Sequence, residues 1–166
     1  MEISLIPLPL SVRLLSRSVV AATLAAGFVP AAAIAAEATS WSHASAPMGQ
    51  FEGGLYISEN AHIGYNCGAG HAFYLTVPGD HVGPGELRID GKVLRAIVLK
   101  PASNKKDSSF ELQVSDSASR EEKDGYNALL SAIEQGEKAQ VAKTGAEPFY
   151  EFTLKGSRGA SICKAR

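Results

Sequence analysis

The sequence predicts a mainly β fold, an antiparallel β-sandwich or small barrel of about eight short strands with one helix at about residues 118–135. Three observations predict it. Short segments rich in β-branched and aromatic residues recur along the chain, and several of them alternate apolar with polar residues. Glycine, proline and Asp-Gly turns separate these segments. Because only one segment has helical apolar spacing, we expect a sheet with one helix covering an end.

The expected strands are each short and bounded by turn-forming or polar residues. They are residues 51–57, 63–67, 72–77, 86–90, 93–99, 110–114, a segment around Val141, and residues 150–154. Asp90-Gly91 favours a tight two-residue turn, because such a turn needs positive φ and these residues tolerate it. Residues 39–50, which contain the only tryptophan, are expected to form a lead-in segment, and residues 78–85 a surface loop.

The helix has clear start and stop signals. Ser119 and Glu122 have the spacing of a capping box, in which each side chain satisfies the other residue's backbone N–H. Gly136 is expected to cap the end of the helix. Four apolar residues at spacings of three and four define one buried face: Tyr126, Leu129, Leu130 and Ile133. Residues 156–163 are expected to form a last helical turn.

Residues 1–36 are predicted to be a secretory signal peptide. Arg13 and Arg17 precede an uncharged, alanine-rich apolar run, and small residues follow at two candidate cleavage positions. An uncleaved membrane anchor is the alternative, although Gly27 and Pro30 interrupt the run. With cleavage, residues 37–166 form a single globular β-rich domain with no membrane span. We expect it in the periplasm or outside a Gram-negative bacterium.

The charge balance argues against nucleic acid as a partner. The chain of 166 residues has 16 Lys and Arg against 17 Asp and Glu. After residue 36 it carries 14 basic and 16 acidic residues, because only Glu2, Arg13 and Arg17 are charged before it. Neither a phosphate loop nor a dinucleotide loop is present, since Gly68-Ala69-Gly70 is too short. We therefore expect no cofactor.

Cys67 and Cys163 are the only cysteines and are predicted to form a disulfide. An isolated pair in an oxidising compartment most often pairs in this way. The alternative makes Cys67 a nucleophile with His71 as its base. It is less favoured, because a partner cysteine exists and no helix start activates Cys67.

The C-terminal part carries a pattern that resembles known exported proteins. It runs Leu129-Leu130, Ala132-Ile133, Gly136 and Val141, then Phe152-Thr153-Leu154-Lys155-Gly156-Ser157, with Ala160 and Cys163. This pattern resembles the C-terminal half of the invasion-associated locus B family of alphaproteobacteria. The chain is also similar in outline to the VasI family of periplasmic proteins associated with type VI secretion. That family has an early tryptophan, a strand ending in a lone cysteine, an arginine-x-aspartate element (here Arg88-Ile89-Asp90) and a late cysteine.

The resemblance implies a β-sandwich module and no transferable active site. This chain lacks the additional paired cysteines of the invasion-associated family. It also lacks the tryptophan that tends to follow the last cysteine in the secretion-associated family. The resemblance therefore bears on the fold and leaves the partner open.

No pattern of catalytic or metal-binding residues is recognised. The histidines His43, His62, His71 and His81 are too widely spaced for a tight ligand pair, although a hairpin could bring His62 opposite His71. No nucleophile elbow is present, and the acidic residues lie in charge-rich loops rather than as an evident pair. We therefore predict neither a catalytic residue nor a metal site.

The candidate binding surface consists of His71, Phe73, Tyr74 and His81, because aromatic residues anchor interfaces. In the competing interpretation, strand alternation places every second aromatic residue in the core. The sequence as a whole predicts an exported, non-enzymatic binding or accessory protein that recognises a protein or cell-envelope component. Two alternatives remain. Tyr65-Asn66-Cys67 is similar to a strand of lysozyme inhibitors, and a hydrolase could act through His71 or His81.

Overall fold

The computed structural model describes residues 40–46, 50–68 and 70–166, and Ala35–Arg166 groups into one compact unit. The predicted export signal, residues 1–36, lies outside the described residues. The strands are β1 (Ser42–Ala46), β2 (Gln50–Ser58), β3 (Ala61–Cys67), β4 (His71–Val77), β5 (Gly83–Ile89), β6 (Lys92–Pro101), β7 (Ser108–Val114), β8 (Lys138–Lys143) and β9 (Pro148–Thr153). The helices are α1 (Arg120–Gln135) and the short 3-10 helix η2 (Ala160–Cys163).

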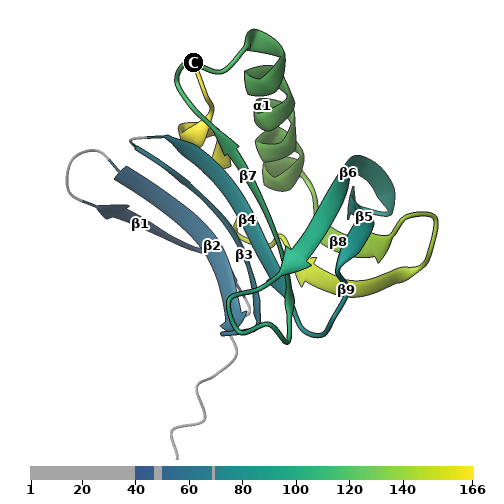
Figure 1. The fold of residues 1–166 in the computed structure, drawn as a ribbon. Helices are drawn as coiled ribbons and strands as arrows, with labels where there is room; N and C mark the ends of the chain where they lie inside the picture. The colour runs from purple at the N-terminus through teal and green to yellow at the C-terminus, as the bar shows by residue number, and fades with distance from the viewer. Residues whose placement is uncertain (1–39, 47–49, 69) are drawn as a thin grey trace, which may run out of the picture. The chain divides into compact units, whose positions relative to one another are not determined.

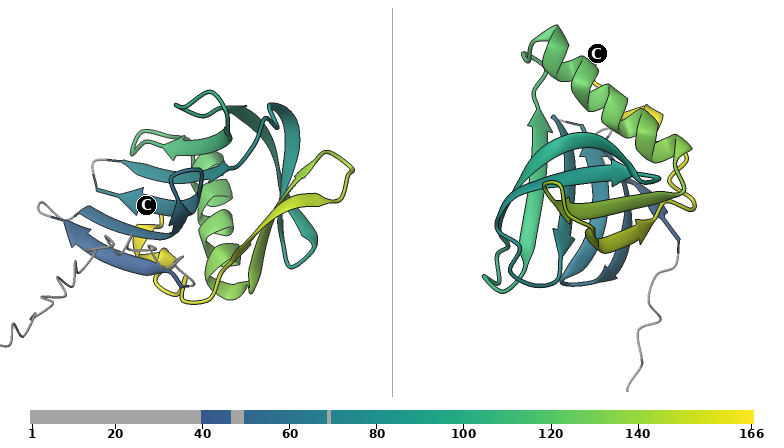
Figure 2. Two further views of the ribbon diagram at one scale, coloured as in Figure 1. Left: turned by 90° about the horizontal axis from the view of Figure 1, so that it is seen from below. Right: turned by 90° about the vertical axis from the view of Figure 1, so that its right-hand side faces the viewer.

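All the strand pairs of this unit are antiparallel, and together they form one curled sheet in the order β1-β2-β3-β4-β7-β6-β5-β8-β9. Only two residue pairs, Lys100↔Ser109 and Pro101↔Ser108, join β6 to β7. The sheet is therefore divided at this junction into two parts, and α1 lies between them (Figures 1 and 2). The prediction of a mainly β, antiparallel fold with one α-helix is confirmed, with nine strands in the described residues rather than about eight.

The core lies on the inner side of the curl, where the two parts of the sheet meet α1. Most of the strands contribute alternate residues and α1 contributes helically spaced ones, as the sequence patterns predicted. Its largest fully buried side chains are Tyr65, Tyr126, Phe73, Phe152, Leu55, Ile63, Leu75, Leu87, Leu99, Leu129, Leu130 and Ile133. This single core fixes which face of β2, β3, β4 and β7 is left for solvent.

The strand that the sequence did not predict is β1, within the expected lead-in. Its residues Ser42–Ala46 are small or polar, so no alternation marks them as a strand. They become one by pairing with β2, from Ser42↔Gly54 to Ala46↔Gln50. The preceding Trp41 anchors the segment, because its indole N–H donates to the Thr153 carbonyl at 2.9 Å and its ring stacks on Tyr65.

The helix forms as its signals predicted. The Ser119 hydroxyl accepts from the Glu122 backbone N–H, and the Glu122 carboxylate accepts from the Ser119 backbone N–H at 2.9 Å. Gly136 ends α1, but its φ of −82° is not left-handed. A Cβ there would lie 2.4 Å from Ile89 Cγ2, so lack of space is what requires glycine.

Of two predictions about turns, the structure confirms one and shortens the other. Asp90 and Gly91 both have positive φ, 50° and 80°, so the expected tight turn joins β5 to β6. The surface loop expected at residues 78–85 is shorter than predicted, because β5 already begins at Gly83. Pro84 is accommodated there because it lies opposite Val98, near the start of the strand.

The predicted disulfide is present: Cys67 and Cys163 are bonded, with their Cα atoms 5.3 Å apart. It ties the end of β3 to η2, which is the last helical turn expected from the sequence. The alternative of a Cys67 nucleophile is therefore wrong, because Cys67 has no thiol to ionise.

Among the described residues, neither α1 nor any other helix is long and apolar enough to cross a membrane.

Candidate functional site

The side of β1, β2, β3, β4 and β7 that faces away from the core is called here the outer face. Strand alternation turns every second residue of these strands toward it. Its members include Ser42, Ala44, Glu52, Gly54, Tyr56, His62, Gly64, Asn66, Ala72, Tyr74, Glu111 and Gln113. The register places them in rows across the sheet, one of which contains Glu52, Asn66, Ala72 and Gln113. Residues far apart in sequence therefore form a continuous surface.

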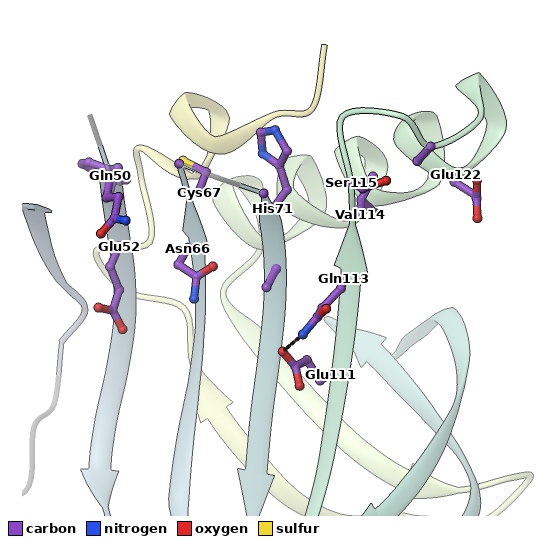
Figure 3. A pocket seen from close by; sticks show the side chains of 15 residues that line it. Gln50, Glu52, Asn66, Cys67, His71, Glu111, Gln113, Val114, Ser115 and Glu122 are labelled. Carbon is purple, nitrogen blue, oxygen red and sulfur yellow. Dashed lines mark hydrogen bonds between the residues drawn. The ribbon is translucent and has the colours of Figure 1, made fainter. Parts of the chain in front are cut away.

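A shallow hollow of about 910 Å³ lies at one end of the outer face, beside the disulfide (Figure 3). The polar side chains around it come from several elements and are Gln50, Glu52, Asn66, His71, Glu111, Gln113, Ser115 and Glu122. None of the described residues that line it is Lys or Arg. Gln113 Nε2 donates to Glu111 Oε1 at 2.6 Å, which orients both side chains. The hollow thus offers mainly hydrogen-bond acceptors and negative charge.

Small residues make room on the outer face for a tyrosine that lies across it. A Cβ on Gly64 would come within 2.7 Å of the Tyr74 hydroxyl, so the ring needs glycine beneath it. The Tyr74 hydroxyl donates to Glu52 Oε1 at 2.6 Å. Burial and this carboxylate both raise the pKa of Tyr74 above its usual range. Tyr74 therefore remains a neutral donor that holds Glu52 at the edge of the hollow.

His62 lies between two tyrosine rings on the same face. Its ring centroid is 5.7 Å from that of Tyr56 and 6.1 Å from that of Tyr74. Burial lowers the pKa of His62, and the nearby carbonyls of Ser58 and Glu59 only oppose this in part. Its Nδ1 is buried without a hydrogen bond of ordinary geometry. The imidazole is therefore neutral at pH 7, and the cluster acts as an aromatic surface rather than as a charge.

This aromatic cluster borders a second, smaller hollow of about 250 Å³. Tyr56, His62, Tyr74 and Glu52 line it, over a floor that includes Gly54. Glu52 lines both hollows. The acidic hollow and the aromatic cluster are therefore neighbouring parts of one surface.

His71 is held at the rim of the larger hollow. Its Nδ1–H donates to the Cys163 carbonyl at 3.0 Å, and its ring meets the Tyr126 ring edge-on. Nε2 lies 3.8 Å from an Asp116 carboxylate oxygen. His71 thus links the disulfide-bonded C-terminal segment to the start of β4. A chemical role for its Nε2 stays a prediction.

The four residues of the predicted binding surface do not come together. Phe73 is fully buried and contacts Phe110, so strand alternation places it in the core. His81 lies beyond the far end of β4 from His71 and stacks on Phe149 with ring centroids 3.7 Å apart. Of the four, His71 borders the larger hollow and Tyr74 lies on the outer face. Because His71 and His81 lie at opposite ends of β4, a hydrolase site could contain one of these histidines but not both.

The β3–β4 hairpin does not bring His62 opposite His71. In the β3–β4 hairpin His62 lies opposite Thr76, while His71 lies opposite Cys67, so the two histidines occupy opposite ends. In the described part of the chain, no group of three or more His, Cys, Asp or Glu side chains is arranged to hold a metal ion.

Sequence reasoning missed the polar residues of the outer face, chiefly Glu52, Asn66, Glu111 and Gln113. Each occupies a solvent-facing position of a strand that the sequence did predict. The signal that could have found them is this alternation combined with the neighbour order of the strands. The pairing of β4 with β7 crosses a long sequence separation, which local patterns do not specify.

Comparisons of the chain with protein-family models, with curated proteins and with solved structures gave no match. The resemblance to the invasion-associated and secretion-associated families therefore stays a prediction. The site has to be interpreted from its own geometry.

Proposed function

We propose that this is an exported protein that acts in the periplasm or outside a Gram-negative bacterium, as a binding or accessory protein without catalytic activity. It recognises a protein or a component of the cell envelope through the outer face. The observation that carries the proposal is the array of oriented acceptors beside an aromatic cluster, of which Tyr56 is exposed and His62 and Tyr74 are partly exposed, on a floor of small residues. Such a surface suits recognition of a partner larger than a small metabolite, because the hollow is broad and shallow.

The chemistry of the outer face favours a partner rich in hydrogen-bond donors or positive charge. Glu52, Glu111 and Glu122 supply negative charge, and Asn66 and Gln113 supply amides. Charge complementarity of this kind steers association and discriminates among partners. Tyr56, whose residue is 56% exposed, supplies apolar area at low cost in conformational entropy.

Export is supported by the disulfide together with the predicted signal peptide. Stable structural disulfides form in oxidising compartments and are rare in the cytosol of mesophiles. The link between Cys67 and Cys163 fastens the C-terminal segment beside the hollow. We therefore expect the mature protein to be found outside the cytoplasm with both cysteines oxidised.

A position-specific photocrosslinking experiment tests the proposal. A benzophenone amino acid is placed at Asn66 or Gln113 in the outer face, and at Glu147 in the β8–β9 turn as a matched exposed control. We expect crosslinked products in cells from the first two positions and not from the third. Glu52→Gln with Glu111→Gln should reduce their yield severalfold, because it removes the negative charge and replaces one acceptor oxygen of each side chain by a donor NH2 group.

Three outcomes would contradict the proposal. These are the absence of products at the outer-face positions, equal products at Glu147, and yields that the double substitution does not change. Retention of the protein in the cytoplasm after cell fractionation would contradict export separately. Glu59→Gln with Glu147→Gln, which removes two exposed charges elsewhere, controls for the change in net charge.

Inhibition of lysozyme is the second candidate, and the negative charge of the larger hollow favours it. An acidic surface attracts and binds a positively charged enzyme through charge complementarity. In the Tyr65-Asn66-Cys67 strand, Asn66 is exposed on the outer face while Tyr65 is buried. A turbidity assay of bacterial lysis with c-, g- and i-type lysozymes decides this. Undiminished lysis by all three in the presence of excess protein excludes inhibition.

A further inference from the structure

A cleft of about 710 Å³ opens where β6 and β7 diverge. The pairing between these strands extends only over Lys100↔Ser109 and Pro101↔Ser108. Beyond Ser109, β7 continues to Val114 in an unbroken ladder with β4, but β6 has turned away. The β7 edge that faces the cleft therefore has no neighbouring strand along most of its length.

The ladder geometry identifies which main-chain groups face the cleft. In the β6–β7 connection, the Ala102 N–H donates to the Asp107 carbonyl at 2.8 Å. Hydrogen-bonded pairs in an antiparallel ladder recur at every second residue, so Lys100 and Ser109 form the next one. Continuing along β7, the N–H and C=O groups of Glu111 and Gln113 point to the same side. They face the cleft, because β6 pairs with β7 no further than Ser109.

The opposite wall of the cleft presents main-chain groups as well. Following the same alternation along β6, the main chain of Val98 and of Ala96 is directed away from β5. An independent feature agrees with this. The residue opposite Val98 on β5 is Pro84, which has no N–H to donate. The cleft is thus bordered on both sides by strand edges with free hydrogen-bonding capacity.

The side chains of the cleft change character from its inner to its outer side. Phe110 and Leu112 are half-buried and, with the buried Ile97, form an apolar inner wall. Glu111 and Lys100 are exposed at the outer rim. An extended segment entering here would place alternate side chains against the apolar wall and the remaining ones toward water.

The β7 edge also lacks the features that protect edge strands elsewhere in this sheet. At one end of the sheet, β9 begins with Pro148 and has an irregular register with β8. Between Phe110 and Val114, β7 has neither proline nor lysine, and its register with β4 has no bulge. Apart from the charge of Glu111 this edge is regular, and a regular strand edge is the kind that pairs with another polypeptide.

We propose that the cleft between β6 and β7 binds an extended peptide segment of a partner protein, which adds as a strand to the edge of β7. The main-chain groups of Glu111 and Gln113 bind the peptide backbone. The apolar wall selects apolar side chains at alternate peptide positions. The occupant is a polypeptide, because only an extended main chain offers donors and acceptors at the matching repeat. This site shares Glu111 and Gln113 with the larger hollow, but it uses their main-chain groups, whereas the outer face uses their side chains.

The probe is a labelled, capped seven-residue peptide that alternates valine with threonine or lysine. Its control is the same peptide with N-methyl groups on alternate residues, which removes the donors and keeps the side chains. Binding is followed by fluorescence anisotropy and by amide hydrogen exchange of the intact, disulfide-bonded chain. We expect the unmodified peptide to bind, the methylated one to bind at least tenfold more weakly, and exchange to slow at Glu111 and Gln113.

Two variants at one position separate main chain from side chain. Glu111→Pro removes the N–H that faces the cleft and leaves the bonds to β4, so peptide affinity should fall at least tenfold. Glu111→Gln keeps that N–H and should bind the peptide much more tightly than the proline variant, although it weakens outer-face recognition. A melting temperature of the proline variant close to that of the glutamine variant shows that it folds.

Several outcomes overturn the proposal. Equal binding of both peptides would show that the backbone is not recognised. Protection at β1 or β9 instead of β7 would place the peptide at another edge. No protection of the two amides at millimolar peptide would also reject the site. Concentration-dependent protection without peptide, accompanied by a dimer in light scattering, would assign the edge to a second copy of this chain.

Discussion

Removing the disulfide should lower the free energy of unfolding by about 4–5 kcal/mol. The perturbation is Cys67→Ala together with Cys163→Ala. The bond joins residues 96 positions apart, and releasing a loop of that length restores a large conformational entropy to the unfolded chain. Alanine is preferred to serine at Cys163, because this residue is fully buried and a hydroxyl there would need a partner.

The structure indicates that the variant still folds. Ser157 Oγ donates to the Ile133 carbonyl at 2.7 Å, and the Asn127 side chain bonds the main chain of Ala165 in both directions. These contacts hold the C-terminal segment on α1 without the covalent bond. The loss of stability is therefore expected to come mainly from the unfolded state.

Equilibrium unfolding in urea, followed by tryptophan fluorescence, measures the loss. Trp41 is the only tryptophan; it is buried and hydrogen-bonded to Thr153, so its emission reports on the folded state. The slope of the free energy against urea should also rise, because the unfolded variant is less compact. A loss below about 1 kcal/mol, with an unchanged slope, would refute this account of the disulfide. Two free thiols in the mass of the unreduced protein would refute its formation.

Three further substitutions test packing and capping. Leu130→Asp should cost at least about 3 kcal/mol in chemical denaturation, because it buries an unpaired charge. Gly136→Ala should cost about 1–3 kcal/mol, since its Cβ would meet Ile89 at 2.4 Å and force a shift. Ser119→Ala should cost about 1 kcal/mol at pH 7 through loss of the helix cap. Hydrogen bonds from Ser119 lower the pKa of Glu122, so this stabilisation is present above about pH 4.3 and is lost as pH falls through the lowered pKa.

Two of these predictions have a matched control variant. Ala128→Asp changes an exposed position of α1 and should leave the unfolding midpoint almost unchanged. Gly125→Ala, in the middle of the same helix, has no close contact and should be neutral or stabilising. If Leu130→Asp unfolded at the same denaturant concentration as the wild type, Leu130 would have to lie on the surface. A cost of Ser119→Ala that does not shrink as the pH falls through the lowered pKa of Glu122 would contradict the role of Glu122.

The predictable part of the fold rests on short-range patterns. Asp90-Gly91 and the Ser119–Glu122 capping box use residues next to or three apart from one another, and both formed as expected. Alternation identified most strands for the same reason. Alternation also accounts for Phe73. The competing interpretation placed every second aromatic residue in the core, and Phe73 is buried there.

The candidate site was harder to predict because it depends on distant pairing. Tyr74 reaches the outer face, but the carboxylate that it binds, Glu52, lies two strands away. The predicted binding surface contained both His71 and His81, yet the whole of β4 separates them. β1 gave no local signal at all, because only its pairing with β2 makes it a strand.

By itself the sequence determined where most strands begin and end, where the helix starts, and that its only two cysteines had each other as partners. Those features depend on φ preferences and side-chain periodicity, which act over a few residues, and on the number of cysteines, which can be counted without knowing the fold. Tertiary structure alone decided that β7 lies beside β4, that β6 then diverges, and that Glu52, Asn66 and Gln113 share one surface. Strand neighbours are selected by burying one common core, and that competition involves the whole chain at once.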